Sequence, residues 1–253
     1  IDQEGGMVTR LPWDAVNVPG SMALAATGKP ENAVLAAEIT ARQLRGVGVN
    51  FNLAPDLDVN SNPMNPVIGV RSFGDDPQSV ALFGSKAVEG YKNGGMLCCG
   101  KHFPGHGDTA EDSHTALAVT YKTLDELQAC ELLPFAADTG LHAVMVGHIA
   151  APNVTGDGTP ATLSPQLVAL IPDAENTLIV TDSLAMDAIT AAYTPGEAAV
   201  QAFQAGCDVL LMPNSLPEAY AAVLEAVRNG TISEERLDRS VNKILLYKQQ
   251  FAS

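Results

Sequence analysis

Apolar and polar residues form two kinds of pattern along the chain. Short apolar runs rich in β-branched residues predict buried strands, and longer segments with apolar residues every three or four positions predict helices. The predicted strands span residues 47–53, 96–100, 143–149, 177–181 and 208–212. The predicted helices span residues 30–45, 76–93, 123–139, 194–205, 217–229 and 233–250. This order is typical of parallel strands that are joined by helices.

Several predicted helices carry recognisable start and stop signals. Asp76-Pro77 places a proline at the first helical position, where its missing N–H is not needed. Ser233 precedes two glutamates and is a residue type favoured as an N-cap. Gly94-Gly95 and Asn229-Gly230 supply residue types that commonly end helices. These signals support the predicted helix boundaries.

Strands that are apolar on both faces belong in a covered parallel sheet, either a closed barrel or an open doubly wound sheet. Polar residues follow four of the predicted strands: Asp56 and Asp58, then Lys101 and His102, then His148, then Asp182. A barrel builds its site from the carboxyl ends of several strands in this way. No glycine-rich nucleotide-binding motif follows any predicted strand. We therefore predict an α/β fold of the (β/α)8 TIM-barrel type.

The barrel prediction also concerns domain organisation. Five strands are clear and a sixth would end at Ile1-Asp2, so a barrel of eight lacks its first strand and helix. No linker or shift in composition divides the chain. We therefore expect a single catalytic barrel domain over residues 1–253 that is incomplete at its N-terminus.

Composition narrows the class of protein further. The 253 residues contain 29 acidic and 14 basic side chains, a net charge of −15, which disfavours a nucleic-acid partner. No apolar run reaches the ~20 residues that a membrane-spanning helix needs. The four cysteines form no C-x-x-C pair and several lie in apolar runs, so we predict buried free thiols. We expect a cytoplasmic protein, with secretion left open because the chain does not begin with Met, and the sequence defines no oligomeric state.

The densest polar stretch runs from Lys101 to His114 and holds three of the five histidines. Pro104 and the neighbouring glycines predict a loop here. Asp112 and His114 are two positions apart, so extended backbone would place both side chains on one side. An imidazole oriented by a carboxylate is suited to proton transfer near neutral pH.

A second carboxylate would have to come from another part of the chain. Asp182 follows an apolar predicted strand and has apolar neighbours. It is a candidate for the site, or alternatively an N-cap of the helix that follows.

Four separated motifs resemble the β-N-acetylglucosaminidases of glycoside hydrolase family 3. They are I-D-Q-E-G-G-x-V-x-R, N-P-V-I-G-V-R-S-F-G, K-H-F-P-G-H-G-D-T followed by D-S-H, and T-D-S-L-A-M. They occur in the family's order and span the chain from residue 1 to the last helix. The resemblance implies a (β/α)8-like barrel and a retaining exo-glycosidase that removes terminal β-linked N-acetylglucosamine, often in peptidoglycan turnover.

The resemblance also assigns roles to individual positions. Asp182 corresponds to the nucleophile, and His114, oriented by Asp112, corresponds to the acid/base. The positions that correspond to sugar-hydroxyl contacts are Asp2, Arg10, Arg71, Lys101 and His102. The implied partner is a small carbohydrate, such as an N-acetylglucosaminide or a muropeptide fragment, and neither metal nor cofactor is expected.

Other interpretations of the same residues stay open. A metal-dependent hydrolase would use the loop side chains His102, His106, Asp108, Asp112 and His114 as ligands. A phosphorylase would use the same site, because a neutral imidazole does not repel phosphate as a carboxylate does. A sugar-binding barrel without activity is a third interpretation. Arg71, finally, could form an ion pair with Asp75 or Asp76 instead of contacting sugar.

Overall fold

The structure, a computed structural model, describes residues 1–110, 117–136 and 140–251. These residues form an α/β fold around a parallel sheet with the strand order β1-β2-β4-β6. Its strands are β1 (Phe51–Asn52), β2 (Leu97–Phe103), β4 (Ala143–Val146) and β6 (Leu178–Thr181). Every pair of neighbours is parallel, and the spatial order follows the chain order. The predicted α/β class with a parallel sheet is confirmed.

Irregular segments continue the sheet beyond both of its edges. At one edge, the N–H of Leu53 donates to the carbonyl of Ile1 at 2.7 Å. At the other edge, Val180 forms a parallel bridge with Val209. The N-terminal residues therefore lie beside β1, and the segment around Val209 lies beside β6. The order of the segments in space again matches their order along the chain.

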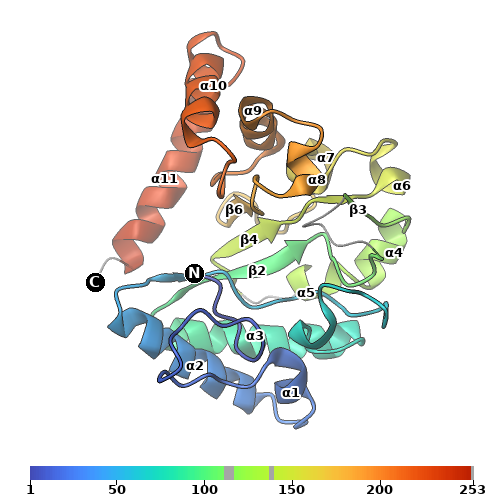
Figure 1. Ribbon diagram of the computed structural model, residues 1–253, viewed down its shortest axis with the longest axis vertical. Coiled ribbons are helices and arrows are strands. Elements are labelled where there is room, and N and C mark those ends of the chain that lie inside the picture. The colour runs from blue at the N-terminus through green and yellow to red at the C-terminus, as the bar shows by residue number, and fades with distance from the viewer. Residues whose placement is uncertain (111–116, 137–139, 252–253) are drawn as a thin grey trace.

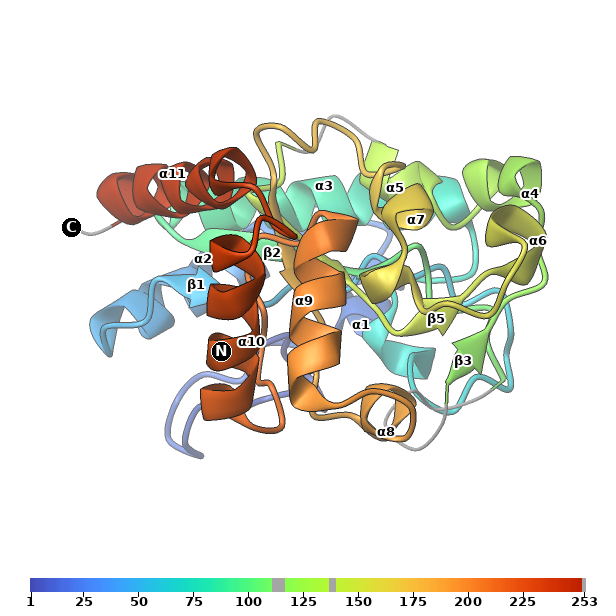
Figure 2. The ribbon, with the colours of Figure 1, turned by 90° about the horizontal axis from the view of Figure 1, so that it is seen from above.

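Helices surround the sheet and a small second sheet flanks it (Figure 1). The second sheet pairs β3 (Ala118–Val119) with β5 (Ile149–Ala150). The helices are α1 (Ser21–Ala25), α2 (Glu31–Gly46), α3 (Pro77–Asn93), α4 (Leu124–Ala129), α5 (Leu133–Ala136), α6 (Pro152–Thr155), α7 (Pro165–Val168), α8 (Asp187–Thr190), α9 (Pro195–Ala205), α10 (Leu216–Arg228) and α11 (Glu234–Phe251), with 3₁₀ turns η1 (Gly69–Arg71) and η2 (Ala161–Leu163). Figure 2 shows α9 and α10 packed side by side.

Both faces of the sheet are buried, as the apolar strands predict. Val144 and Ile179 belong to the cluster that packs against the surrounding helices. Met145 and Val180 belong to a separate cluster together with Leu53. Because neighbouring residues of a strand point to opposite faces, β4 and β6 contribute to both clusters.

The long helices are confirmed close to their predicted bounds. Asp76 is the N-cap of α3, and its side chain accepts the N–H of Ser79 at 2.8 Å. The side chain of Ser233 accepts the N–H of Arg236 at 3.2 Å at the start of α11. Gly94 follows α3 as its C-cap. These local signals predicted the helix ends correctly because capping depends on only a few neighbouring residues.

The single helix predicted over residues 123–139 is wrong. The chain forms α4, breaks at Cys130 and continues as α5. Pro134 explains the break, because its ring would clash with the carbonyl of Cys130 in a continuous helix. Residues 137–139 lie outside the described residues.

Several strand boundaries also differ from the prediction. β2 continues to Phe103, so Lys101 and His102 lie within the strand instead of after it. The predicted strand 47–53 begins only at Phe51, because α2 runs to Gly46 and a turn follows.

Two further predicted strands are shorter than their apolar runs. The run 143–149 is divided between β4, which ends at Val146, and β5, which begins at Ile149. The run 208–212 forms only the bridge at Val209. Met212 has a φ of 47°, a left-handed conformation that cannot extend a strand.

All four cysteines are free, as predicted, and Cys98, Cys99 and Cys207 are buried while Cys130 is partly buried. Among the helices of the described residues, none combines the length and the apolar character needed to cross a membrane.

Candidate active site

Charged side chains gather at the carboxyl ends of the parallel strands. Asp56 and Asp58 follow β1, and the backbone of Asp56 bridges that of Lys101 in the last part of β2. Asp182 follows β6 directly. The fold brings these residues together because the carboxyl ends of parallel strands meet at one edge of the sheet.

Lys101 is a buried cation held by two carboxylates. Its Nζ lies 2.7 Å from Asp2 Oδ1 and 2.7 Å from Glu4 Oε1. Burial alone would lower the pKa of Lys101, but Glu4 and Asp2 outweigh it and raise the pKa. The ammonium group is therefore positively charged at neutral pH.

Arg71 binds the same glutamate from another side. Its Nη2 lies 2.8 Å from Glu4 Oε1 and its Nε lies 3.0 Å from Glu4 Oε2, a bidentate pair. Nη2 also lies 3.5 Å from Asp56 Oδ2. The alternative of an ion pair with Asp75 or Asp76 is therefore wrong, since Arg71 turns toward the sheet.

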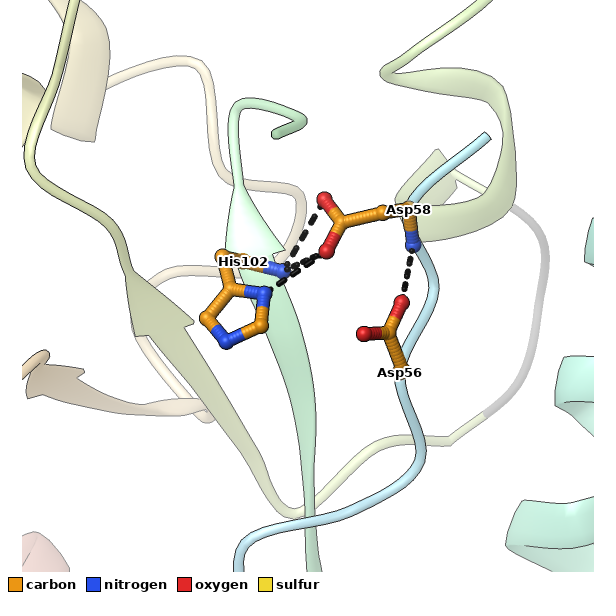
Figure 3. Close-up of side chains that lie close together, drawn as sticks. All are labelled: Asp56, Asp58 and His102. Carbon is orange, nitrogen blue, oxygen red and sulfur yellow. Dashed lines mark hydrogen bonds and ion pairs between the residues drawn. The ribbon is translucent and has the colours of Figure 1, made fainter. Parts of the chain in front are cut away.

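Asp58 fixes the ring of His102 (Figure 3). Asp58 Oδ2 lies 2.6 Å from His102 Nδ1, and Asp58 Oδ1 accepts the N–H of His106 at 2.6 Å. Burial opposes ionisation of Asp58, but His102 and the N–H of His106 hold its pKa well below the usual range. Because a carboxylate can only accept, Nδ1 carries the hydrogen and Nε2 is the ring atom that faces Arg71, 3.5 Å from Nη2.

The cluster offers a possible metal-binding geometry that the sequence did not predict. Asp56, Asp58 and His102 each offer a ligand atom within 4.8 Å of the others. Burial, and then Asp58, raise the pKa of Asp56, which favours its neutral form. The Arg71 guanidinium touches both Asp56 Oδ2 and His102 Nε2, and its charge would repel a cation. The geometry therefore favours a neutral polar ligand over a metal ion.

The loop ligands of the metal-hydrolase interpretation have other partners where the structure describes them. The His106 Nδ1 lies 2.7 Å from Thr109 Oγ1. Asp108 Oδ1 lies 3.4 Å from the ammonium group of Lys122. These contacts engage His106 Nδ1 and Asp108 Oδ1 and give that interpretation no support.

Asp182 is held at the end of β6 by backbone hydrogen bonds. Its N–H donates to the carbonyl of Val146 at 2.9 Å, and its Oδ1 accepts the N–H of Ser183 at 2.7 Å. Burial raises the pKa of Asp182, but His102, His148 and Lys101 are close enough for the net pKa to be lowered. The carboxylate is therefore ionised at neutral pH.

Asp182 is not an N-cap. The next helix, α8, begins at Asp187 and has Met186 as its N-cap. The alternative structural role that the local sequence suggested for Asp182 is therefore wrong.

The remaining sugar-contact candidates divide into two groups. Asp2 joins the cluster through Lys101. Arg10 is exposed, and its guanidinium donates to the carbonyl of Thr9 at 3.3 Å. The structure thus brings Asp2, Arg71, Lys101, His102 and Asp182 together and leaves Arg10 outside the cluster. Asp112 and His114 lie outside the described residues.

The described part of the His-rich loop is tightly anchored. A Cβ on Gly107 would lie 1.9 Å from the carbonyl oxygen of Val59, and one on Gly105 would lie 2.5 Å from Glu131 Cβ. Gly105 also has a φ of +132°, which L side chains rarely adopt. Only glycine allows this close approach at both positions.

Sequence reasoning missed Glu4, and it placed Asp58 and His148 at strand ends without predicting their partners. Glu4 joins Lys101 to Arg71, Asp58 orients His102, and His148 lies near Asp182. A signal for Glu4 was present, because it lies two residues beyond Asp2 and extended backbone places both side chains on one side. Asp58 and His148 were already grouped with the strand ends at which a barrel builds its site.

The ion pairs of Glu4 make a prediction about stability in acid. Burial opposes ionisation of Glu4, but Lys101 and Arg71 lower its pKa from 4.5 to about 2. The ionised glutamate therefore stabilises the fold fully above pH 4.5 and loses this contribution as the pH falls toward 2. We expect urea unfolding to show wild type more stable than Glu4→Gln at pH 6, with a difference that narrows steadily between pH 4.5 and 2. A difference that does not change with pH would contradict the assignment.

A parallel α/β fold with ionised and hydrogen-bonding side chains at the carboxyl ends of its strands defines a ligand-binding domain of the kind that enzymes use. The model of the glycosyl hydrolase family 3 N-terminal domain matches residues 1–246. The chain belongs to this family, and the resemblance inferred from the sequence motifs is confirmed.

Known proteins support this assignment over nearly the whole chain. Beta-hexosaminidase A of Pseudoalteromonas piscicida is 35% identical over 279 residues, which cover 98% of this chain and 46% of that protein. A family 3 β-N-acetylglucosaminidase structure from Paenibacillus sp. str. FPU-7 is 47% identical with a TM-score of 0.95, covering 99% of this chain and 49% of that one. The structure of the beta-glucoside phosphorylase BglX is 30% identical with a TM-score of 0.92, covering 99% and 47%. The chain thus spans about half the length of these relatives.

Proposed function

We propose that the protein is a retaining exo-glycosidase, a β-N-acetylhexosaminidase that removes terminal β-linked N-acetylglucosamine. The observation that carries the proposal is Asp182, a carboxylate kept ionised beside fixed hydrogen-bond donors. A retaining glycosidase needs such an anion on one face of the anomeric carbon. The similarity to hexosaminidases supports the choice of sugar.

In the proposed first step, Asp182 attacks the anomeric carbon. Its Oδ1 accepts the N–H of Ser183, so Oδ2 is the oxygen that forms the new bond. The bond from the anomeric carbon to the leaving oxygen breaks, and His114 gives that oxygen its proton. In the second step water attacks the same carbon, His114 takes the proton of the water, and Asp182 leaves as a carboxylate.

The other cluster residues are suited to holding the sugar. Lys101 and Arg71 present charged donors, and Asp2 presents acceptors to hydroxyl groups. Glu4 holds the charged groups of Lys101 and Arg71 in place. Asp58 keeps His102 Nε2 turned toward Arg71. These contacts bind an uncharged sugar through its hydroxyls and need no metal ion.

The complete fold, the natural substrate, the location and the acceptor are proposed from the sequence and from the family to which the chain belongs. We propose that the parallel strands form part of a (β/α)8 barrel. The sequence resemblance implies fragments of peptidoglycan turnover as the substrate class. We propose a cytoplasmic location because the four free cysteines fit a reducing compartment. Hydrolysis and phosphorolysis share the first step, and the likeness to a beta-glucoside phosphorylase makes phosphate the second candidate acceptor.

One experiment separates the two acceptors. We expect the whole natural protein to release 4-nitrophenol from 4-nitrophenyl N-acetyl-β-glucosaminide, with β-N-acetylglucosamine as the first sugar seen by proton NMR. Added phosphate should leave the product unchanged if the acceptor is water, and should yield the sugar 1-phosphate if it is phosphate. Release of the α-anomer of the free sugar first, or no turnover, would contradict a retaining hexosaminidase.

A further inference from the structure

His148 is a fully buried histidine to which the mechanism above gives no role. It lies between β4 and β5, at the same end of the sheet as Asp182. Its Nε2 lies 2.8 Å from the carbonyl oxygen of Ser183. Its Nδ1 lies 2.8 Å from Thr162 Oγ1. Both ring nitrogens therefore have defined partners on neighbouring segments.

These partners indicate where the hydrogens lie. A carbonyl oxygen can only accept, so Nε2 of His148 must carry a hydrogen. Thr162 has one hydroxyl hydrogen, and its Oγ1 lies 2.9 Å from the carbonyl of Gly147 and 3.1 Å from that of Val146. If Thr162 donates to either carbonyl, its oxygen accepts from Nδ1. An imidazolium, with hydrogens on both nitrogens, satisfies both ring contacts while the Thr162 hydroxyl donates to one of the two carbonyls.

The contacts continue from His148 to the proposed nucleophile. Ser183, whose carbonyl His148 binds, donates its own N–H to Asp182 Oδ1 at 2.7 Å. Asp182 in turn donates its N–H to Val146, one of the two carbonyls next to Thr162 Oγ1. The nucleophile and the histidine are therefore fixed by one continuous set of hydrogen bonds.

We propose that His148 is a positively charged positioning residue for Asp182. It holds the Ser183 peptide so that the Ser183 N–H binds Oδ1 and leaves Oδ2 to react, and its charge keeps the carboxylate ionised. This inference rests on the proposed function of Asp182.

Other titratable groups also face Asp182 and set the size of the effect. Lys101 and His102 face it from β2, and His106 interacts with it from the loop after that strand. Burial of Asp182 works against ionisation. Loss of the His148 charge should therefore raise the pKa of Asp182, while Lys101 prevents complete neutralisation.

The test compares two buried histidines at opposite ends of one strand. His148→Gln removes the ring charge and keeps an N–H that can reach the Ser183 carbonyl. His142→Gln is the matched control, because His142 precedes β4 and contacts Cys98 instead. We expect the acid limb of kcat/KM in the whole protein to move to higher pH by about one unit in His148→Gln. The limb of His142→Gln should coincide with that of wild type.

A second variant, Thr162→Val, tests the same proposal if His148→Gln does not fold. Thr162→Val keeps His148 and the volume of the side chain but removes the hydroxyl that accepts from Nδ1. We expect its acid limb to move in the same direction by a smaller amount, with a native circular dichroism spectrum. Acid limbs that coincide with wild type in both folded variants would overturn the proposal.

A measurement without turnover tests the charge directly. Nitrogen-15 NMR of the imidazoles at pH 7, with His148 assigned by the signal missing in His148→Gln or shifted in Thr162→Val, should show both nitrogens protonated. A neutral ring would overturn the proposal. If wild type lacked glycosidase activity altogether, the proposed function would fail while this spectrum still reported the charge of His148.

Discussion

Replacing Asp182 by alanine should lower kcat for N-acetylglucosaminide hydrolysis by about 10⁴-fold or more. The mutation removes the atom that bonds to the anomeric carbon, and among the described residues no other carboxylate follows β6 directly. The fold should persist, because Asp182 makes its main contacts through backbone atoms and Ser183. Steady-state kinetics with 4-nitrophenyl N-acetyl-β-glucosaminide would measure the loss.

Asp187→Ala is the matched control for this variant. Asp187 lies five positions further on, at the start of α8, and is exposed. It should retain the wild-type rate. Turnover close to wild type in folded Asp182→Ala protein would remove Asp182 from the role of nucleophile.

Replacing His114 by alanine should affect substrates according to their leaving groups. Hydrolysis of alkyl glycosides and disaccharides, which need a proton on the departing oxygen, should slow by about 10²- to 10⁴-fold. Activated aryl glycosides, whose leaving group departs as a stable anion, should lose much less in the first step. Asp112→Ala should give the same pattern in weaker form, because it disturbs the orientation of the imidazole and not its presence.

The comparison of kcat/KM across a series of leaving groups measures this effect. A steeper dependence of rate on leaving-group pKa in His114→Ala than in wild type would support the acid role. Equal losses on every substrate would assign His114 to sugar binding instead.

Local signals in the sequence predicted the long helices well. α3 runs from the proline after Asp76 to Asn93 because a cap, an apolar period and a terminal glycine pair all agree. The wrong prediction of one helix over residues 123–139 shows that an apolar period does not account for the steric effect of a single proline. The period of residues 123–139 is helical, but the steric effect of Pro134 on Cys130 overrides it.

The site was predictable in part, for a physical reason. Lys101, His102 and Asp182 could be grouped because parallel strands place their carboxyl ends together. The partners of these residues could not be read in the same way, because ion pairs depend on three-dimensional distance. Glu4 contacts Lys101 and Arg71 across 97 and 67 positions of the chain. Arg10, which the family motif suggested, shows the opposite case of a matching residue outside the cluster.

The glycine contacts after β2 show which positions of the His-rich segment an engineered variant should keep. Gly105 and Gly107 leave no space for a side chain, and Asn65 binds the carbonyls of His106 and Thr109 at 2.8 and 2.9 Å. Substitutions within residues 105–109 would therefore disturb the scaffold beside His102. A directed-evolution library that aims at new leaving groups should therefore leave residues 105–109 unchanged.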